Sequence, residues 1–164
     1  MIGLALFAVL AATVPAASQC GGVDDQSPEP LCRKIAELGK FESAKFGPQV
    51  AGVQTIEAFY QREWGTGFHN QSVALLQADH GQFRVLWTHE SISAGADPFN
   101  ANSDEATVFR WKVSPDGAEI VVTGTHTLGH VTDLWTGKAV GRTQSLPSER
   151  YCFQPKARVF SECR

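Results

Sequence analysis

Residues 108–127 read VFRWKVSPDGAEIVVTGTHT, and this stretch decides the fold. Apolar and polar residues alternate over Val108–Val113, which is typical of a strand with one buried face. The four residues Ser114-Pro115-Asp116-Gly117 then supply a proline that fixes φ and a glycine that accepts positive φ, the two requirements of a tight turn. Ile120–Thr127 is again rich in β-branched residues. The stretch therefore predicts a β-hairpin.

Two further hairpins are expected on either side of this one. Each has two β-rich runs that are joined by a short segment containing glycine. The earlier hairpin comprises Ser72–Gln77, the turn Asp79-His80-Gly81 and Gln82–Glu90, and the later one comprises Val131–Trp135, the turn Thr136-Gly137-Lys138 and Ala139–Leu146. A last short strand is predicted over Tyr151–Phe153. Strands that follow one another through tight turns favour an antiparallel meander.

The residues before the hairpins favour helix. Pro30 suits the first turn of a helix, and apolar residues recur near helical spacing as far as Phe41, until Gly47-Pro48 ends the pattern. Residues 54–63 are predicted as a second helix, although Val53, Thr55 and Ile56 also suit a strand. We therefore expect a mostly β (α+β) fold. Its N-terminal helical segment packs on a curved antiparallel meander sheet or half-barrel of about six to eight strands.

One part of the later region resembles a known family. The stretch Val121–Thr127 (VVTGTHT), followed by Thr136-Gly137-Lys138, is similar to the sheet of SnoaL-like proteins in the NTF2-like superfamily. That fold places helices first and then wraps a curved antiparallel sheet around a pocket. The resemblance implies an NTF2-like cone as the alternative architecture, and it assigns no catalytic residue.

Residues 1–18 are predicted to be an export signal. An apolar run ends at Pro15, and Ala16 and Ser18 supply the small residues that a signal peptidase requires, so cleavage is expected before Gln19. The run is shorter than the roughly 20 residues of a membrane-spanning helix, so no membrane span is expected after cleavage. Residues 19–164 would then form a single domain in a secreted or periplasmic compartment.

Export explains the cysteines. The four cysteines lie near the two ends of the predicted mature chain, at Cys20, Cys32, Cys152 and Cys163. An even number of cysteines in an oxidising compartment predicts disulfides, and four cysteines allow three pairings. We favour the local pairs Cys20–Cys32 and Cys152–Cys163, while a clip that joins the two termini remains the alternative.

The composition narrows the possible partners. The formal net charge is only −3, whereas a nucleic-acid-binding surface needs a dense basic face. No cofactor-binding motif is recognised, so no cofactor is predicted. An unknown small ligand or extracellular protein is the expected partner.

Two histidines are the best candidates for a site. His89 ends the predicted apolar face of Phe83, Val85 and Trp87, and His126 lies on a neighbouring predicted strand. If both faces point inward, His89, His126, Arg142 and Trp87 would line an apolar pocket with a few polar groups at its mouth, where an imidazole could act as a general base. The competing interpretation is that these histidines belong to the core or its rim and bind backbone carbonyls.

A metal site is a weaker alternative. His126 and His130 are four residues apart and Asp133 follows, so three ligands could hold Zn²⁺ with an open position. Gly129 is expected to break the strand between the two histidines, which argues against a shared face.

The sequence favours a binding module over an enzyme. The disulfide-bonded scaffold, the predicted long loop Ser93–Asp104 and the lack of a catalytic signature motivate this hypothesis. The alternatives are an enzyme with a histidine-containing hydrophobic pocket in an NTF2-like fold, and a structural protein of the cell envelope.

Overall fold

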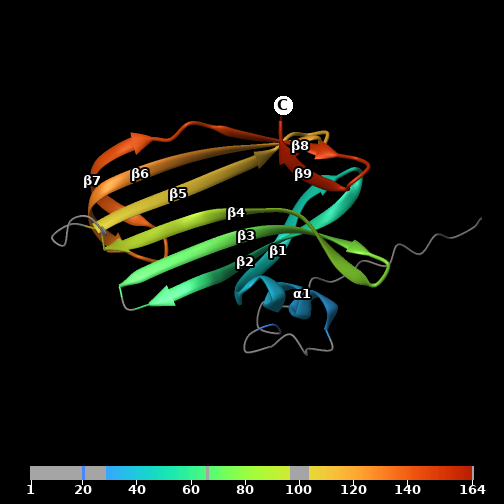
Figure 1. The fold of residues 1–164 in the computed structure, drawn as a ribbon, viewed down its shortest axis with the longest axis horizontal. Coiled ribbons are helices and arrows are strands. Elements are labelled where there is room, and N and C mark those ends of the chain that lie inside the picture. The colour runs from blue at the N-terminus through green and yellow to red at the C-terminus, as the bar shows by residue number, and fades with distance from the viewer. Residues whose placement is uncertain (1–19, 21–28, 66, 97–103, 164) are drawn as a thin grey trace, which may run out of the picture.

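The part of the chain that the structure describes folds into one helix and a single antiparallel sheet (Figure 1). The computed structural model describes residue 20 and residues 29–65, 67–96 and 104–163. Within them, helix α1 and strands β1 to β9 have the following bounds: α1 Pro30–Leu38, β1 Lys40–Val50, β2 Val53–Gly65, β3 Phe68–Asp79, β4 Gln82–Ala96, β5 Asp104–Val113, β6 Glu119–Asp133, β7 Lys138–Ser145, β8 Glu149–Gln154 and β9 Val159–Glu162. The strands pair in the order β1-β2-β3-β4-β5-β6-β8-β9, and β7 pairs with β6. The expected antiparallel meander is therefore confirmed, with nine strands in the described residues.

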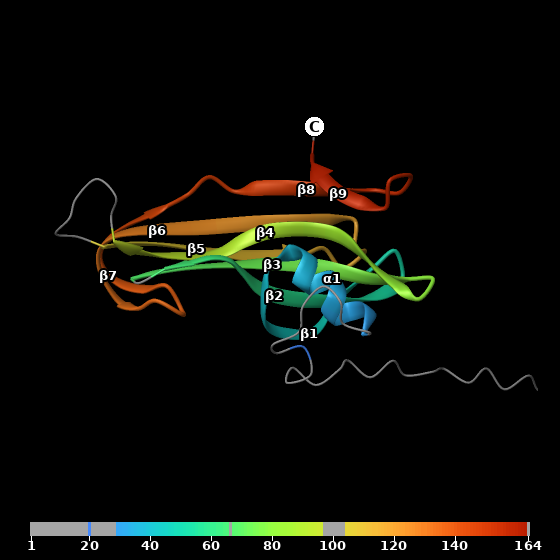
Figure 2. The same ribbon diagram turned by 60° about the horizontal axis from the view of Figure 1, so that its bottom comes forward.

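The sheet is bent so that its two halves face each other. Strands β4 and β5 pair only through Ile92–Ala96 and Asp104–Val108. Beyond these residues the half formed by β5, β6, β8 and β9 lies over the half formed by β1 to β4 (Figures 1 and 2). The buried side chains between the halves come from both of them: Val50, Val73, Leu75, Leu86, Trp87, Ile120, Val122 and Phe160. We call this group the inter-half core.

A second core lies on the other face of β1 to β4, under α1. Leu31 and Ile35 of the helix are buried against Ile56, Tyr60 and Leu76 of the sheet. Burial of a large aliphatic or aromatic side chain contributes about 1.5–3 kcal/mol. The helix therefore gains its stability from this contact, since nine residues are too few for a stable isolated helix. We call this group the helix core.

The prediction that the first helix runs beyond Leu38 is wrong. The helix ends at Gly39, and Lys40–Val50 forms edge strand β1. A Cβ atom at position 39 would overlap the backbone of Gln61 on β2, so only glycine allows the chain to turn this close to the sheet. Phe41 does belong to the helix core, but it reaches that core from a strand.

The predicted helix over residues 54–63 is also wrong, because Val53–Gly65 is strand β2. Ile56, Ala58 and Tyr60 face the helix core, while Glu57 and Phe59 lie on the opposite face. Both faces of β2 are covered, so the strand lacks the apolar and polar alternation of a half-buried strand. This loss of alternation made the segment look like a helix.

The hairpin of β3 and β4 has the predicted turn, but the side chains of β4 do not all point to the predicted faces of the sheet. His80 and Gly81 adopt φ values of 50° and 79°, as a two-residue hairpin turn requires. The register slips between Leu75 and Leu76, which leaves Leu86 as an extra residue in β4. Phe83 and Val85 therefore pack in the helix core, whereas Trp87 lies in the inter-half core. The bulge corrects the expectation that Phe83 and Val85 share a face with His89, whereas Trp87 does share that face.

The central hairpin is confirmed, and the third hairpin differs in detail. Strands β5 and β6 pair from Val113 and Ile120 outward, and β6 continues unbroken through Gly129 to Asp133. Gly129 was expected to break the strand, but it pairs with Gly141 of β7. The predicted loop Ser93–Asp104 is shorter than expected, because β4 reaches Ala96 and β5 begins at Asp104. Residues 97–103 lie outside the described residues.

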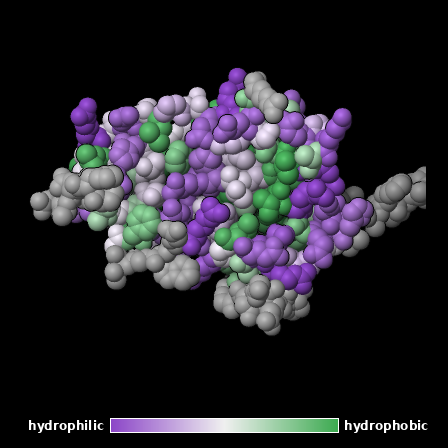
Figure 3. Space-filling model, in the orientation of Figure 1, coloured by the Kyte–Doolittle hydropathy of each residue, from purple (hydrophilic) through white to green (hydrophobic). Residues whose placement is uncertain are grey.

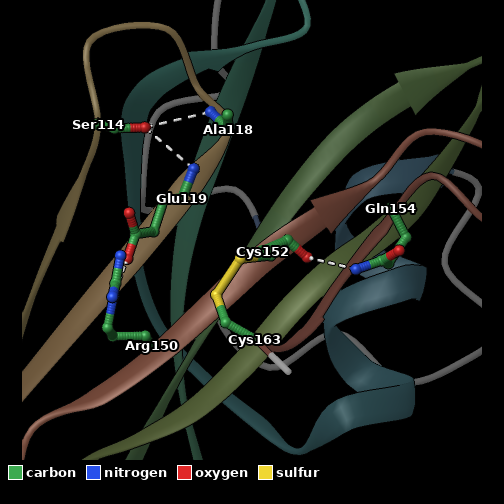
Figure 4. Close-up of a disulfide and its surroundings, with 7 residues drawn as sticks. All are labelled: Ser114, Ala118, Glu119, Arg150, Cys152, Gln154 and Cys163. Carbon is green, nitrogen blue, oxygen red and sulfur yellow. Dashed lines mark hydrogen bonds and ion pairs between the residues drawn. A yellow bond between two sulfur atoms is a disulfide. The ribbon is translucent and has the colours of Figure 1, made fainter.

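Both predicted local disulfides form. Cys20 bonds to Cys32, and Cys152 bonds to Cys163 with a Cα–Cα distance of 5.1 Å. The second bond links β8 to Cys163, the residue after β9, near the turn where Ser114 accepts hydrogen bonds from two backbone N–H groups (Figure 4). The alternative clip between the termini is therefore wrong. Two disulfides are consistent with an oxidising compartment.

The remaining expectations concern the N-terminus and the alternative fold. The predicted signal, residues 1–18, lies outside the described residues. Where the structure is described, no helix is long and apolar enough to cross a membrane. The described chain carries a single short helix before the sheet, whereas the NTF2-like resemblance implied several. Figure 3 shows that the face presented in Figure 1 is mostly hydrophilic, with a band of apolar side chains above α1.

Candidate functional site

A groove opens where the two halves of the sheet diverge. Its volume is about 610 Å³, which falls in the usual range for small-molecule sites. Its walls come from strands β1 to β5 and from the turn between β6 and β7. The lining residues are Lys45, Glu57, Phe59, Gln71, Ser91, Ile92, Val108, Phe109, Arg110, Trp111, Trp135 and Thr136. We call this cavity the β1–β5 groove.

A buried carboxylate lies at the centre of the groove. Glu57 projects from β2 and is only 8% exposed. Its Oε1 accepts a hydrogen bond from Trp111 Nε1 at 3.0 Å, and its Oε2 lies 2.9 Å from Lys45 Nζ. The carboxylate thus connects both halves of the sheet, since Trp111 belongs to β5. A buried charge is tolerated only with such partners.

Aromatic rings form the apolar wall. The rings of Phe59 and Trp111 are 5.9 Å apart and tilted by 42°. Lys45 Nζ lies 5.6 Å from the centre of the Phe59 ring, within the range of a cation–π contact. Phe59 and Trp111 also pack against the inter-half core, which fixes their positions. The wall is therefore preformed.

The neutral polar groups of the groove are hydrogen-bonded to each other. Ser91 Oγ donates to Gln71 Oε1 at 2.8 Å and also lies 3.1 Å from the Gln71 carbonyl oxygen. The Gln71 side-chain amide in turn donates to Glu42 Oε2 on β1. These contacts hold the polar end of the groove in one arrangement.

The turn between β6 and β7 closes one end of the groove. Trp135 is 65% exposed, yet its ring centre lies 4.5 Å from the ring of His69 on β3. The turn is fixed by Asp133, which accepts hydrogen bonds from the Trp135 backbone N–H at 3.0 Å and from the Thr136 hydroxyl at 2.8 Å. The hydrogen bond from Thr136, followed by that from Trp135, holds the pKa of Asp133 below its usual range. Trp135 is therefore an exposed aromatic residue on a rigid support.

A close backbone crossing directs this turn toward the groove. Gly129 of β6 pairs with Gly141 of β7, and a Cβ atom at either position would overlap the opposing backbone. Only glycines allow this approach. Beyond the crossing the hairpin carries Gly137 close to Val108 and Ile92 in the groove wall.

His89 does not line the β1–β5 groove. Its side chain is only 10% exposed and stacks on Trp87, with ring centres 5.5 Å apart and planes inclined by 22°. His89 Nε2 lies 3.2 Å from Glu149 Oε2, and its Nδ1 faces the Glu90 carbonyl oxygen. Both ring nitrogens of His89 therefore contact an oxygen atom. The interaction joins β4 to β8 across the opening between the sheet halves.

The acid partner of His89 also contacts a tyrosine. Tyr151 donates its hydroxyl hydrogen to Glu149 Oε2. This hydrogen bond, together with His89, holds the pKa of Glu149 below its usual range. Burial, followed by the Glu149 contact, raises the pKa of Tyr151. His89 also borders a smaller cavity of about 200 Å³, together with Tyr60 and Ser72.

The predicted four-residue pocket is not assembled. Trp87 is 5% exposed and belongs to the inter-half core, while Arg142 is exposed on β7 opposite Leu128. His126 Nδ1 lies 3.0 Å from the Thr107 hydroxyl, and among the described residues no hydrogen bond joins it to His89. The two histidines thus have separate partners, and no shared acid–base site follows from their placement.

The three residues of the predicted Zn²⁺ site also contact different partners. His126 lies 3.9 Å from Glu105, His130 lies 3.4 Å from Asp104, and Asp133 binds its own turn. In the part of the chain that the structure describes, no group of three or more His, Cys, Asp or Glu side chains is arranged to hold a metal ion.

Sequence reasoning missed the central residues of the groove. Glu57 and Phe59 lie in the segment that was predicted as a helix, so their shared face with Lys45 was not visible. One signal was present, because the acidic Glu57 interrupts the apolar run Ile56–Tyr60. No protein-family model matches the chain, and neither the curated proteins nor the solved structures compared with it contain a match.

Proposed function

We propose that this protein is an exported binding module that takes a small molecule into the β1–β5 groove. The observation that carries the proposal is the groove itself, which combines a volume of about 610 Å³, a preformed aromatic wall and a few fixed polar groups. Small-molecule sites combine apolar and aromatic walls with placed polar groups, and six of the twelve residues that line this groove are apolar. The hydrogen bonds of Glu57, Gln71 and Ser91 provide the rigidity that lowers the entropic cost of binding.

The proposed compartment is secreted or periplasmic. Two lines of support agree: the signal-like residues 1–18 and the two disulfides. Each disulfide closes a short local loop, so each can form as soon as its own segment is exported.

A ligand screen tests the binding proposal. The mature chain, labelled with ¹⁵N, is titrated with a fragment library, and shifts of backbone amides are followed. We expect hits to shift amides near Phe59, Trp111 and Trp135. Trp135→Ala should weaken them by about threefold to tenfold, the value of one aromatic contact.

Val140→Ala is the matched control. Val140 is 66% exposed on β7 and does not line the groove, so its removal should leave affinity unchanged. A screen without hits in the groove, or hits that Val140→Ala and Trp135→Ala weaken equally, would contradict the proposal.

The compartment is tested by expression of the full chain in a bacterium. We expect the periplasmic fraction to contain a protein that begins at Gln19 and has no alkylatable thiol. A cytosolic protein that retains Met1 and four free thiols would contradict export.

A further inference from the structure

The groups that line the β1–β5 groove differ in whether they already have partners, and this difference identifies a ligand class. Glu57 is the one acidic residue among the lining residues. Both of its oxygens are engaged, one by Trp111 and one by Lys45. A cationic ligand would therefore have to displace an existing ion pair, which disfavours cations.

The neutral polar groups are engaged as well. Ser91 and Gln71 bond to each other, and Gln71 also bonds to Glu42. A sugar needs several free donors and acceptors around its ring, and it would have to break these hydrogen bonds. A polyhydroxyl ligand is disfavoured for this reason.

Among the charged residues that line the groove, one cationic side chain has no ion-pair partner in the described part of the chain. Arg110 of β5 lines the groove and is exposed, and no carboxylate of the described residues lies within ion-pair distance of it. Lys45 has a side chain that is 62% exposed, so its ammonium group retains donors that face solvent. With Lys45, Arg110 and Glu57 the groove carries one more positive than negative charge, although the whole chain has a net charge of −3.

Aromatic side chains also line the groove. Trp135 is 65% exposed at one end of the groove, and Phe59 and Trp111 form the wall along it. Flat rings stack on such faces, while a planar guanidinium binds carboxylate, sulfonate or phosphate with two parallel hydrogen bonds.

We propose that the ligand of the β1–β5 groove is a flat aromatic anion, with its rings against Trp111 and Trp135 and its acidic group at Arg110. This inference rests on the proposed function and specifies it. The proposal needs no movement of the Glu57 contacts, because the acidic group binds at Arg110, which forms no ion pair within the described residues.

Two fluorescent probes with the same ring skeleton test the charge requirement. Anilinonaphthalene sulfonate carries an acidic group, and phenylnaphthylamine lacks it. The mature, disulfide-bonded protein is titrated with each probe, and thermal unfolding confirms that every variant is folded. We expect the sulfonate to bind at least about threefold more tightly than the neutral probe, as one partly exposed charged contact provides.

Arg110→Gln should weaken the sulfonate by about threefold to tenfold and leave the affinity for the neutral probe within about twofold. Lys112→Gln removes an exposed cation from the same strand, two residues away and outside the groove, and should affect neither probe. Trp135→Ala should weaken both probes, which places them in the groove.

The outcomes separate the two proposals. If both probes bind, both respond to Trp135→Ala, and Arg110→Gln has no effect on the sulfonate, the aromatic anion is refuted while the groove remains a binding site. If neither probe responds to Trp135→Ala, or neither binds, both proposals fail.

Discussion

The contacts of Glu57 allow one prediction to be worked out in detail. The same carboxylate has a buried partner and an exposed one. Its hydrogen bond from Trp111 is 3.0 Å long and lies between the sheet halves, whereas its ion pair with Lys45 ends on a side chain that is 62% exposed. A hydrogen bond to a charged group contributes about 1.5–3 kcal/mol, while an exposed ion pair contributes about 0.2–1 kcal/mol. The Trp111–Glu57 coupling should therefore exceed the Lys45–Glu57 coupling.

Two double-mutant cycles measure these couplings. The variants are Trp111→Phe, Lys45→Met and Glu57→Met, with each of the first two also combined with the third. Methionine replaces the glutamate with a side chain of similar length and no charge, so the Trp111→Phe, Glu57→Met double variant leaves neither partner of that hydrogen bond unpaired. In the Lys45 cycle the Trp111 N–H loses its acceptor in both variants that carry Glu57→Met, so this cost cancels. The free energy of unfolding comes from urea titrations at neutral pH with the disulfides intact, by linear extrapolation.

We expect a coupling of about 1.5 kcal/mol or more for Trp111 with Glu57, and less than about 1 kcal/mol for Lys45 with Glu57. Glu57→Met alone should destabilise the protein, because it leaves the Trp111 N–H without its acceptor. A Lys45–Glu57 coupling energy equal to or larger than the Trp111–Glu57 coupling energy would refute the reasoning. Solvent exposure would then not determine which of the two contacts is stronger.

Three further predictions concern stability. The pKa of Glu149 in the folded protein is below its ordinary value of 4.5, so its contribution to stability is present above that value and is lost as the pH falls through the folded pKa. Between about pH 6 and about pH 3 the melting temperature should therefore fall less for Glu149→Gln than for the wild type. An equal fall in both proteins would show that the Glu149 carboxylate does not contribute to acid destabilisation. Replacing Cys152 and Cys163 together by serine should lower the free energy of unfolding by about 2–4 kcal/mol in urea titrations, because the unfolded chain gains the entropy of the opened loop; no change would contradict a structural role. Gly141→Ala should cost about 1–3 kcal/mol, because the new Cβ overlaps the backbone of β6, whereas Gln144→Ala on the exposed part of the same strand should stay within about 0.5 kcal/mol.

Local features of the sequence were interpreted correctly because local chemistry decides them. The turn Ser114–Gly117 sets its own backbone geometry, and Asp116 strengthens it by accepting hydrogen bonds from Ser114 and from the Ala118 N–H. The disulfides each close over 12 and 11 positions, so their pairing follows from proximity along the chain.

The candidate site depended on contacts that no local pattern contains. The predicted pocket of His89 and His126 assumed that alternation continues along β4, but the extra residue Leu86 moves Trp87 to the opposite face from Val85. A bulge of this kind is set by the partner strand, which the sequence of β4 alone does not reveal. The bulge separates Phe83 and Val85 from Trp87 and His89, which still stack on each other, while His126 and Arg142 have their own partners on β5 and β6.

The sequence by itself determined the fold class and the disulfide pairing, because turn residues, strand composition and neighbouring cysteines act over short distances along the chain. Only the tertiary structure decided which face of β2 meets β5, and with it the placement of Glu57 against Trp111. Both faces of β2 are buried, so its sequence lacks the alternation of apolar and polar residues that marks a strand. The segment that supplies Glu57 and Phe59 to the β1–β5 groove was therefore predicted as a helix.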